Sequence, residues 1–382
     1  MVASARSALL ERVRGRELLV AQDTTSLRDD GGKRGLYLHP AIVFDAADGA
    51  LLGLLTAEFL VHDESPEIHR HQRGLHEKES RRWVEAAAQA ADLLAAGASR
   101  VTMVADREAD LYEMFACLPE GVEVLVRARH DRCLTDGGRL YEACEGQPEP
   151  GRETIELPSI PGRPARRATF ALHARRVCIE RPKRSRADRA AELSASVSLA
   201  LVEAREIDPP PGETPAHWRL LTTRTVESLD DARLIVSYYR RRWAIEQVFR
   251  LMKTRGFDIE AVPIRENEPL KNLGCATRIA AIQIQQMLHD RDGRAERPMT
   301  DVFEPADQPI IETIGRSLEG RTERQRNPHP PASLAHATWI CARLGGWTGY
   351  HGKPGPIVLA RGHQRLLTMI EGIKRSGLVR IL

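Results

Sequence analysis

Four polar residues recur at helical spacing in a stretch that contains neither glycine nor proline, Asp230 to Arg255. They are Tyr239, Arg242, Glu246 and Lys253. At about 100° per residue, these side chains fall within an arc of roughly 60° on a helix. Acids begin the stretch and cations end it, as the helix dipole favours. The pattern predicts one long helix that offers a polar stripe to a cleft.

The other side of this helix is apolar, through Leu234, Ile245, Val248 and Met252. We expect that side to be buried. Amphipathic character alone would also suit a surface helix whose Glu246 and Lys253 only face solvent, so the stripe does not by itself establish a reaction.

Two further carboxylates stand where they could meet Glu246. Asp23 follows one expected strand and Asp106 follows another. Phosphodiester chemistry uses two metal ions about 3.5 to 4 Å apart, held by hard oxygen ligands that converge from separate elements. Three such carboxylates could hold magnesium or manganese. Taken singly, Asp106 could instead cap the next helix, and Asp23 could be a strand-end or turn residue.

The elements that must position these residues follow from apolar patterning and turn residues. The expected strands are Glu17 to Asp23, Leu36 to Phe44, Leu51 to Phe59, Val101 to Ala105 and Val122 to Val126, and the expected helices are Ser80 to Ala96, closed by Gly97, and Glu108 to Cys117. An antiparallel meander followed by parallel strands matches a ribonuclease-H-like α/β mixed sheet with flanking helices. Turn residues Gly31 and Gly32 follow the first strand.

The rest of the chain changes character twice. Short alternating runs, among them Ala168 to Leu172 and Arg176 to Ile179, predict an inserted antiparallel β subdomain, and Trp218 to Thr222 resembles another core strand. Helical runs occur later, at Ile279 to Leu288, Leu334 to Leu344 and Leu366 to Ile373. The expected domains are a core in two parts, 1–126 and 218–268, an insertion at 127–217, and a C-terminal helical region at 269–382.

Composition limits the function classes. Apolar residues make up 42% and charged residues 29%, which is ordinary for a globular protein, and the net charge is only +3. Arginines cluster, for example at Arg240 to Arg242, although solvated surface explains a single cluster equally well. Six cysteines without a CxxC pair suit a reducing compartment. Because no signal segment or membrane span is visible, we expect a cytoplasmic, nucleoid-associated protein that does not enter membranes.

Two other kinds of site are disfavoured. His69, His71 and His76 lie close together but lack zinc-ligand spacing. No Walker loop or dinucleotide fingerprint is present, so we expect no nucleotide cofactor.

The spacing Y-x2-R-x3-E-x6-K resembles the signature of bacterial insertion-sequence DDE transposases of the YREK class. The resemblance extends to the run Asp23-Thr24-Thr25-Ser26 and to Asp106-Arg107-Glu108-Ala109-Asp110, which are similar to the family's two other acidic motifs, and to Glu77 to Ser80, Val126 to His130 and Pro209 to Trp218. It covers nearly the whole chain.

This resemblance implies roles for individual residues. Asp23, Asp106 and Glu246 would be catalytic ligands of two Mg²⁺ or Mn²⁺ ions. Side chains that grip phosphates near the transposon end would be Tyr239, Arg242 and Lys253, with Arg127 as a further DNA contact. Trp218 would stack on a flipped base, a contact worth about 1 to 3 kcal/mol, although a core tryptophan is also compatible with the sequence.

The implied reaction is nicking of double-stranded DNA, hairpin formation, hairpin opening and strand transfer of an insertion sequence, by a protein that is a homodimer when bound to DNA. Only about twenty residues precede Asp23, where related transposases have a helical domain that binds the transposon ends. Two other functions therefore stay open. One is an end-blind copy that dimerises with full-length copies and inhibits them, and the other is a nonspecific metal-dependent nuclease.

Overall fold

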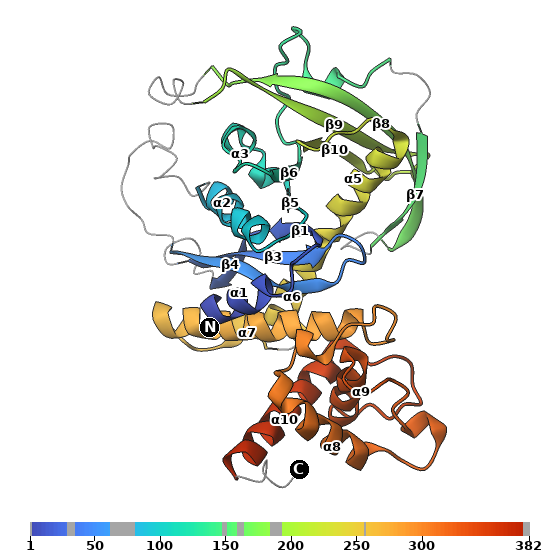
Figure 1. The fold of residues 1–382 in the computed structure, drawn as a ribbon. Coiled ribbons are helices and arrows are strands. Elements are labelled where there is room, and N and C mark those ends of the chain that lie inside the picture. Colours follow the sequence, from blue (N-terminus) through green and yellow to red (C-terminus); the bar gives the residue numbers. More distant parts are fainter. Residues whose placement is uncertain are drawn as a thin grey trace. The chain divides into compact units, whose positions relative to one another are not determined.

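The computed structural model describes residues 2–28, 35–61, 81–146, 151–158, 164–183, 193–255 and 257–376. The chain folds as two compact units. One unit consists of Met1–Arg12, Thr24–Ser65 and Ala244–Leu382, and the other of Val13–Asp23 and Pro66–Trp243. We call them the helical unit and the sheet unit (Figure 1).

Seven strands of the sheet unit are hydrogen-bonded in the spatial order β1, β5, β6, β10, β9, β8, β7. Their bounds are β1 Glu17–Gln22, β5 Arg100–Ala105, β6 Val122–Arg127, β7 Gly151–Leu157, β8 Arg166–Glu180, β9 Ser196–Ile207 and β10 His217–Thr222. The first three strands run parallel to one another, and every later pairing is antiparallel. The expectation of parallel additions and a final core strand is confirmed.

The parallel strands are buried on both faces, as their continuous apolar runs require. Helix α2 (Arg81–Ala95) packs on them with an apolar side that includes Trp83 and Leu93, and it ends before Gly97, whose φ of +98° suits glycine. Helix α5 (Leu229–Arg241) packs against β8 and β9 as well as β5 and β6. Figure 1 shows α2 and α5 on the two sides of these strands.

Two sequence expectations in this unit are wrong in detail. The runs expected as separate short strands form one continuous strand, β8, because its residues Thr169 to Glu180 pair without interruption with β9. The helix expected from Glu108 to Cys117 is instead a 3₁₀ turn, η2 (Arg107–Ala109), followed by the short α3 (Tyr112–Ala116). Asp110 separates the two because its side chain and carbonyl bind another segment.

The predicted long helix from Asp230 to Arg255 is also divided. Helix α5 ends at Arg241, α6 spans Trp243–Arg250, and Leu251–Arg255 form a π-helical turn, η4. Arg242 caps α5 at the point where the chain passes from the sheet unit to the helical unit. A Ser228–Asp231 capping box begins α5, as its acidic start suggested.

The helical unit contains three antiparallel strands of the ten-stranded sheet and several helices. Its elements are α1 Val2–Leu10, β2 Thr25–Arg28, β3 Leu36–Asp45, β4 Leu51–Val61, α7 Asn267–His289, α8 Gln308–Leu318, α9 Leu334–Leu344 and α10 Pro356–Arg375. Strand β3 pairs with both β2 and β4, and α1 and α7 pack on β4. The three predicted C-terminal helices are confirmed, whereas α1, β2 and α8 were not predicted.

Some expectations fall outside the described residues. These concern the Gly31-Gly32 turn, the run Glu77 to Ser80, and the histidines His69, His71 and His76. The predicted domain boundaries stay predictions. The six cysteines all lie in the described residues, and no disulfide joins them. No helix in the described part of the chain is long and apolar enough to span a membrane.

A candidate active site at the carboxyl ends of parallel strands

Strand register brings three of the predicted site residues into one row. In the β1–β5 pairing, Ala21 is opposite Val104. Continued two residues beyond this pair, which is one residue past the end of each strand, the same register aligns Asp23 with Asp106. The β5–β6 register, which pairs Ala105 with Val126, then aligns Asp106 with Arg127. Neighbouring strands are about 4.8 Å apart, and aligned residues face the same side of a sheet.

The Asp106 carboxylate both caps a turn and keeps acceptor capacity. Its Oδ1 accepts a hydrogen bond from the Glu108 backbone N–H at 2.8 Å, which caps η2. Its Oδ2 has no hydrogen-bond or ion-pair partner among the described residues. The alternative of a capping aspartate is therefore confirmed, and it leaves one oxygen available for a ligand.

The Asp23 carboxylate pairs with an arginine of the predicted stripe. Nη1 of Arg242 donates to Oδ2 of Asp23 at 2.8 Å, and both side chains are mostly buried, at 12% and 17% exposed. The Arg242 guanidinium also lies 5.9 Å from the ring centroid of Tyr239. Arg242 thus supplies a positive charge next to the first carboxylate of the row.

Trp218 belongs to an aromatic cluster beside this row. Its ring stacks on Phe170 at a centroid distance of 5.2 Å and contacts Tyr239 in a tilted arrangement at 5.9 Å. Arg127 donates to the backbone carbonyl of His217 at 2.9 Å, which ties the row to the start of β10. Six of the eight predicted site residues therefore belong to the sheet unit, at one end of its strands.

The remaining two, Glu246 and Lys253, belong to the helical unit. Glu246 lies half-buried on α6. Nζ of Lys253 donates to Oγ of Ser26 at 3.1 Å and pairs with Glu260 at 2.8 Å. Lys253 thus contacts the end of the run Asp23-Thr24-Thr25-Ser26, whose Thr24 hydroxyl shares a hydrogen bond with His39 at 2.9 Å. Sequence reasoning missed the contacts of Ser26 and His39, because neither has an unusual spacing.

The expected division of the helix into a polar and an apolar side holds only in part. Ile245, Val248 and Met252 are buried as predicted, but Leu234 is 38% exposed and Tyr239 is only 8% exposed. The reason is that α5 presents Ile235 and its two tyrosines to the sheet, which rotates Leu234 toward solvent.

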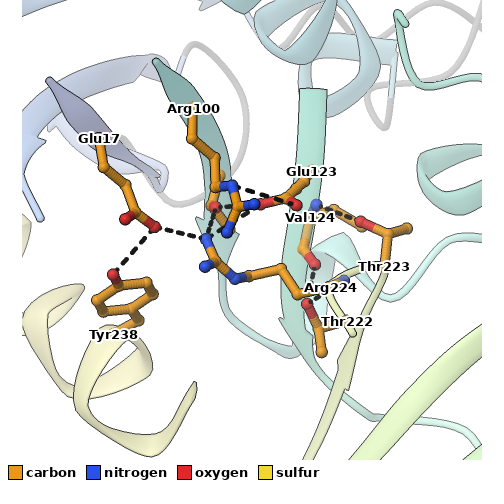
Figure 2. A network of polar contacts seen from close by, with 9 residues as sticks. Glu17, Arg100, Glu123, Val124, Thr222, Thr223, Arg224 and Tyr238 are labelled. Carbon is orange, nitrogen blue, oxygen red and sulfur yellow. Dashed lines mark hydrogen bonds and ion pairs between the residues drawn. The ribbon is translucent and has the colours of Figure 1, made fainter. Parts of the chain in front are cut away.

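A different set of charges lies at the amino ends of the same strands (Figure 2). Nη1 of Arg224 donates to Glu17 at 2.7 Å and to Glu123 at 3.0 Å, and it also contacts the Thr102 hydroxyl at 3.0 Å. The Tyr238 hydroxyl donates to Glu17 at 3.1 Å. Burial, the charge of Glu17 and this hydrogen bond raise the pKa of Tyr238 to about 12.

Residues 70–281 match the family model described as the transposase DDE domain, which is more than half of the chain. The chain belongs to this family. It is a DDE transposase, a metal-dependent enzyme that cleaves DNA. The matched range contains Asp106 and Glu246, whereas Asp23 precedes it.

Only part of the predicted set of metal ligands of this transposase lies within one unit. Asp23 and Asp106 are hard oxygen ligands of the kind that Mg²⁺ and Mn²⁺ prefer. Across the described residues, no three His, Cys, Asp or Glu side chains gather as a metal site. The sheet unit thus contributes two suitable carboxylates, and the third predicted ligand comes from the helical unit.

Proposed function

We propose that this DDE transposase is of the YREK class, with a ribonuclease-H-like core, and that it excises and inserts an insertion sequence through nicking, hairpin formation and strand transfer. The observation that carries the proposal is the register that aligns Asp23 with Asp106 at the carboxyl ends of neighbouring parallel strands. Such strand ends are the usual binding edge of α/β sheets.

Asp23, Asp106 and Glu246 are proposed to hold two Mg²⁺ or Mn²⁺ ions. Bound metal would activate a water or 3′-hydroxyl and stabilise the leaving oxygen. The two aspartates suit this role because one oxygen of Asp106 has no partner among the described residues and because Arg242 already balances charge at Asp23. Glu246 on α6 would complete the set.

The cationic and aromatic residues are proposed to orient DNA. Arg242, Arg127 and Lys253 would bind phosphates through charge-assisted hydrogen bonds, and Tyr239 supports Arg242 through its ring. Trp218 already packs against two aromatic rings. Such a cluster would hold its indole rigidly for stacking on an unpaired base.

We further propose that the substrate-bound form is a homodimer that pairs two transposon ends. This assembly, the hairpin step and the choice of DNA ends all rest on the motifs Tyr239 to Lys253, Asp23 to Ser26 and Asp106 to Asp110.

The test uses linear DNA that carries the inverted repeats flanking the native gene, with Mg²⁺ or Mn²⁺. The expected products are a nick at the repeat and then a hairpin, seen on denaturing gels. Glu246→Ala should remove both products while changing the DNA dissociation constant little, since it removes a ligand and no phosphate contact. Cleavage that ignores the repeats would instead identify a nonspecific nuclease, and manganese-dependent cleavage by Glu246→Ala would refute the ligand assignment.

A further inference from the structure

The carboxylate of Asp110 accepts four hydrogen bonds within the sheet unit. Its side chain is fully buried. Oδ2 accepts the backbone N–H of Arg129 at 2.7 Å and of His130 at 2.9 Å. Oδ1 accepts both Nε and Nη2 of Arg132, at 3.1 and 2.5 Å, and Nη2 also donates to the Asp110 carbonyl at 2.8 Å.

These contacts join the two segments that leave the carboxyl ends of β5 and β6. Asp110 lies one 3₁₀ turn after Asp106, and residues 129, 130 and 132 follow Arg127. Since Asp106 and Arg127 are aligned in register, the carboxylate of Asp110 ties together the chain on both sides of that pair. The side chains of Arg129 and His130 remain exposed.

A simpler role for Asp110 would be to favour the positive end of α3. The geometry does not fit that role, because the N-cap of α3 is Leu111 and has no side-chain hydrogen bond. Among the described residues, the Asp110 side chain is hydrogen-bonded to Arg129, His130 and Arg132 instead. A carboxylate that accepts several N–H groups in a buried place is held firmly, and removing it would leave those donors and the Arg132 charge without partners.

We propose that Asp110 is a positioning residue for the metal-dependent reaction. Through the backbone of residues 129 and 130 it fixes Arg127 and the η2 turn relative to one another, and therefore the direction of the Asp106 carboxylate. It also fixes the backbone that carries the exposed Arg129 and His130 side chains, which a DNA phosphate can reach. This inference rests on the proposed role of Asp106 as a metal ligand.

The experiment compares Asp110→Asn with the unchanged full-length chain. The asparagine amide places N–H donors against Arg132 or the backbone N–H groups, so the clamp is broken while side-chain volume is kept. We expect faster amide hydrogen exchange at residues 129 and 130, weaker Mn²⁺ binding measured by electron paramagnetic resonance, and at least a tenfold higher metal concentration for half-maximal cleavage.

Glu123→Gln is the matched control. It weakens another carboxylate–arginine pair on the same two strands but at their amino ends, so it should lower stability and leave the half-saturating metal concentration unchanged. If Asp110→Asn does not fold, Arg132→Lys replaces it, since lysine keeps the charge and cannot make the bidentate contact. A several-fold rise in the metal requirement is expected for that variant.

The inference would be overturned if folded Asp110→Asn cleaved DNA at the wild-type metal concentration and bound Mn²⁺ with wild-type affinity. The same result in Arg132→Lys would overturn it where that variant is used instead. An equal rise in the metal requirement of Glu123→Gln would also overturn it. Failure of the unchanged protein to cleave DNA with any divalent metal would contradict the proposed function instead. The two failures are therefore distinguishable.

Discussion

The parallel strands β1, β5 and β6 carry charged residues at both ends, and the two ends differ in how those charges are matched. At the amino ends, Arg224 lies between Glu17 and Glu123 and contacts both, so the charges are balanced within the protein. At the carboxyl ends, Asp23 and Asp106 stand side by side in register. Arg127, next in the row, donates to a backbone carbonyl.

The comparison separates charge that stabilises the fold from charge that serves a ligand. A buried ion pair rarely adds net stability, but breaking one leaves an unmatched charge and is costly. At the carboxyl ends, by contrast, two aligned carboxylates repel each other and gain from a cation, although Arg242 pairs with one of them. We therefore expect substitutions at the amino ends to change stability, and substitutions at the carboxyl ends to change activity.

The largest expected effect tests the carboxyl ends. Asp106→Asn keeps an oxygen that can cap η2 but loses the charge, so metal-dependent cleavage should fall by at least ~10³-fold, as is common when one member of a cooperating catalytic set is removed. The unfolding free energy should stay within about 0.5 kcal/mol of wild type or rise, because a like-charge repulsion is relieved. Gel-based cleavage and urea unfolding measure the two. A large loss of stability would contradict the expectation that charges at the carboxyl ends of the strands serve activity and not stability.

The next effect tests the amino ends. Arg224→Met removes the cation that Glu17 and Glu123 share, although Arg100 stays 3.9 Å from Glu123. Because both carboxylates are partly exposed, the unfolding free energy should fall by about 2 to 3 kcal/mol. At a temperature where the variant is folded, its cleavage rate per folded molecule should stay within a few-fold of wild type. Adding Glu17→Gln and Glu123→Gln should restore part of the stability, and urea unfolding of the triple variant checks this. If cleavage were lost while the fold was kept, the amino ends would have a direct part in the reaction.

A smaller effect is expected for Tyr238→Phe, which removes a hydrogen bond to the Glu17 carboxylate and should cost about 1 to 2 kcal/mol at neutral pH. The raised pKa of Tyr238, about 12, predicts a pH dependence. Because an unfolded tyrosine loses its proton near pH 10, the folded state alone keeps the proton between about pH 10 and 12, and stability falls as pH rises. The difference between wild type and Tyr238→Phe should therefore shrink across that window, measured by unfolding at each pH.

The smallest effect is expected for Arg242→Gln. Its ion pair with Asp23 is mostly buried, but glutamine keeps an N–H donor for the carboxylate, so we expect only about 1 kcal/mol of destabilisation. The plot of the logarithm of the DNA-binding constant against the logarithm of the salt concentration should have a slope smaller in magnitude by about 1. The reason is that one phosphate contact no longer releases counterions. Fluorescence anisotropy at several salt concentrations measures the slope. An unchanged slope would mean that Arg242 serves only to orient Asp23.

Much of the fold and part of the candidate site followed from local sequence pattern. Apolar runs that end in Asp23 and Asp106 predicted adjacent strand ends, and the register bears out that these residues are aligned. Helix α2 was predictable because its apolar residues repeat at helical spacing. These features depend on residues close together in the chain, which sequence reasoning can use.

Other features depend on partners that are distant in sequence. The break at Arg242 was not visible, because the stretch around it favours helix throughout and the division arises where two compact units meet along the chain. The four polar and apolar residues of β2 gave no periodic signal. Asp110 looked like an ordinary helix-start acid, since its real partner, Arg132, lies twenty-two residues later.

The Thr102–Glu123 pair has a consequence for the whole row of site residues. These residues are directly opposite each other in the β5–β6 register and are joined by a hydrogen bond of 3.0 Å that Arg224 shares. Because β5 is apolar on both faces, its hydrophobic pattern alone would tolerate a slip of one residue, yet such a slip would turn Asp106 to the opposite face. The polar pair therefore favours the observed register, and a glutamine at position 123 would keep it, because its amide oxygen can still accept the Thr102 hydroxyl.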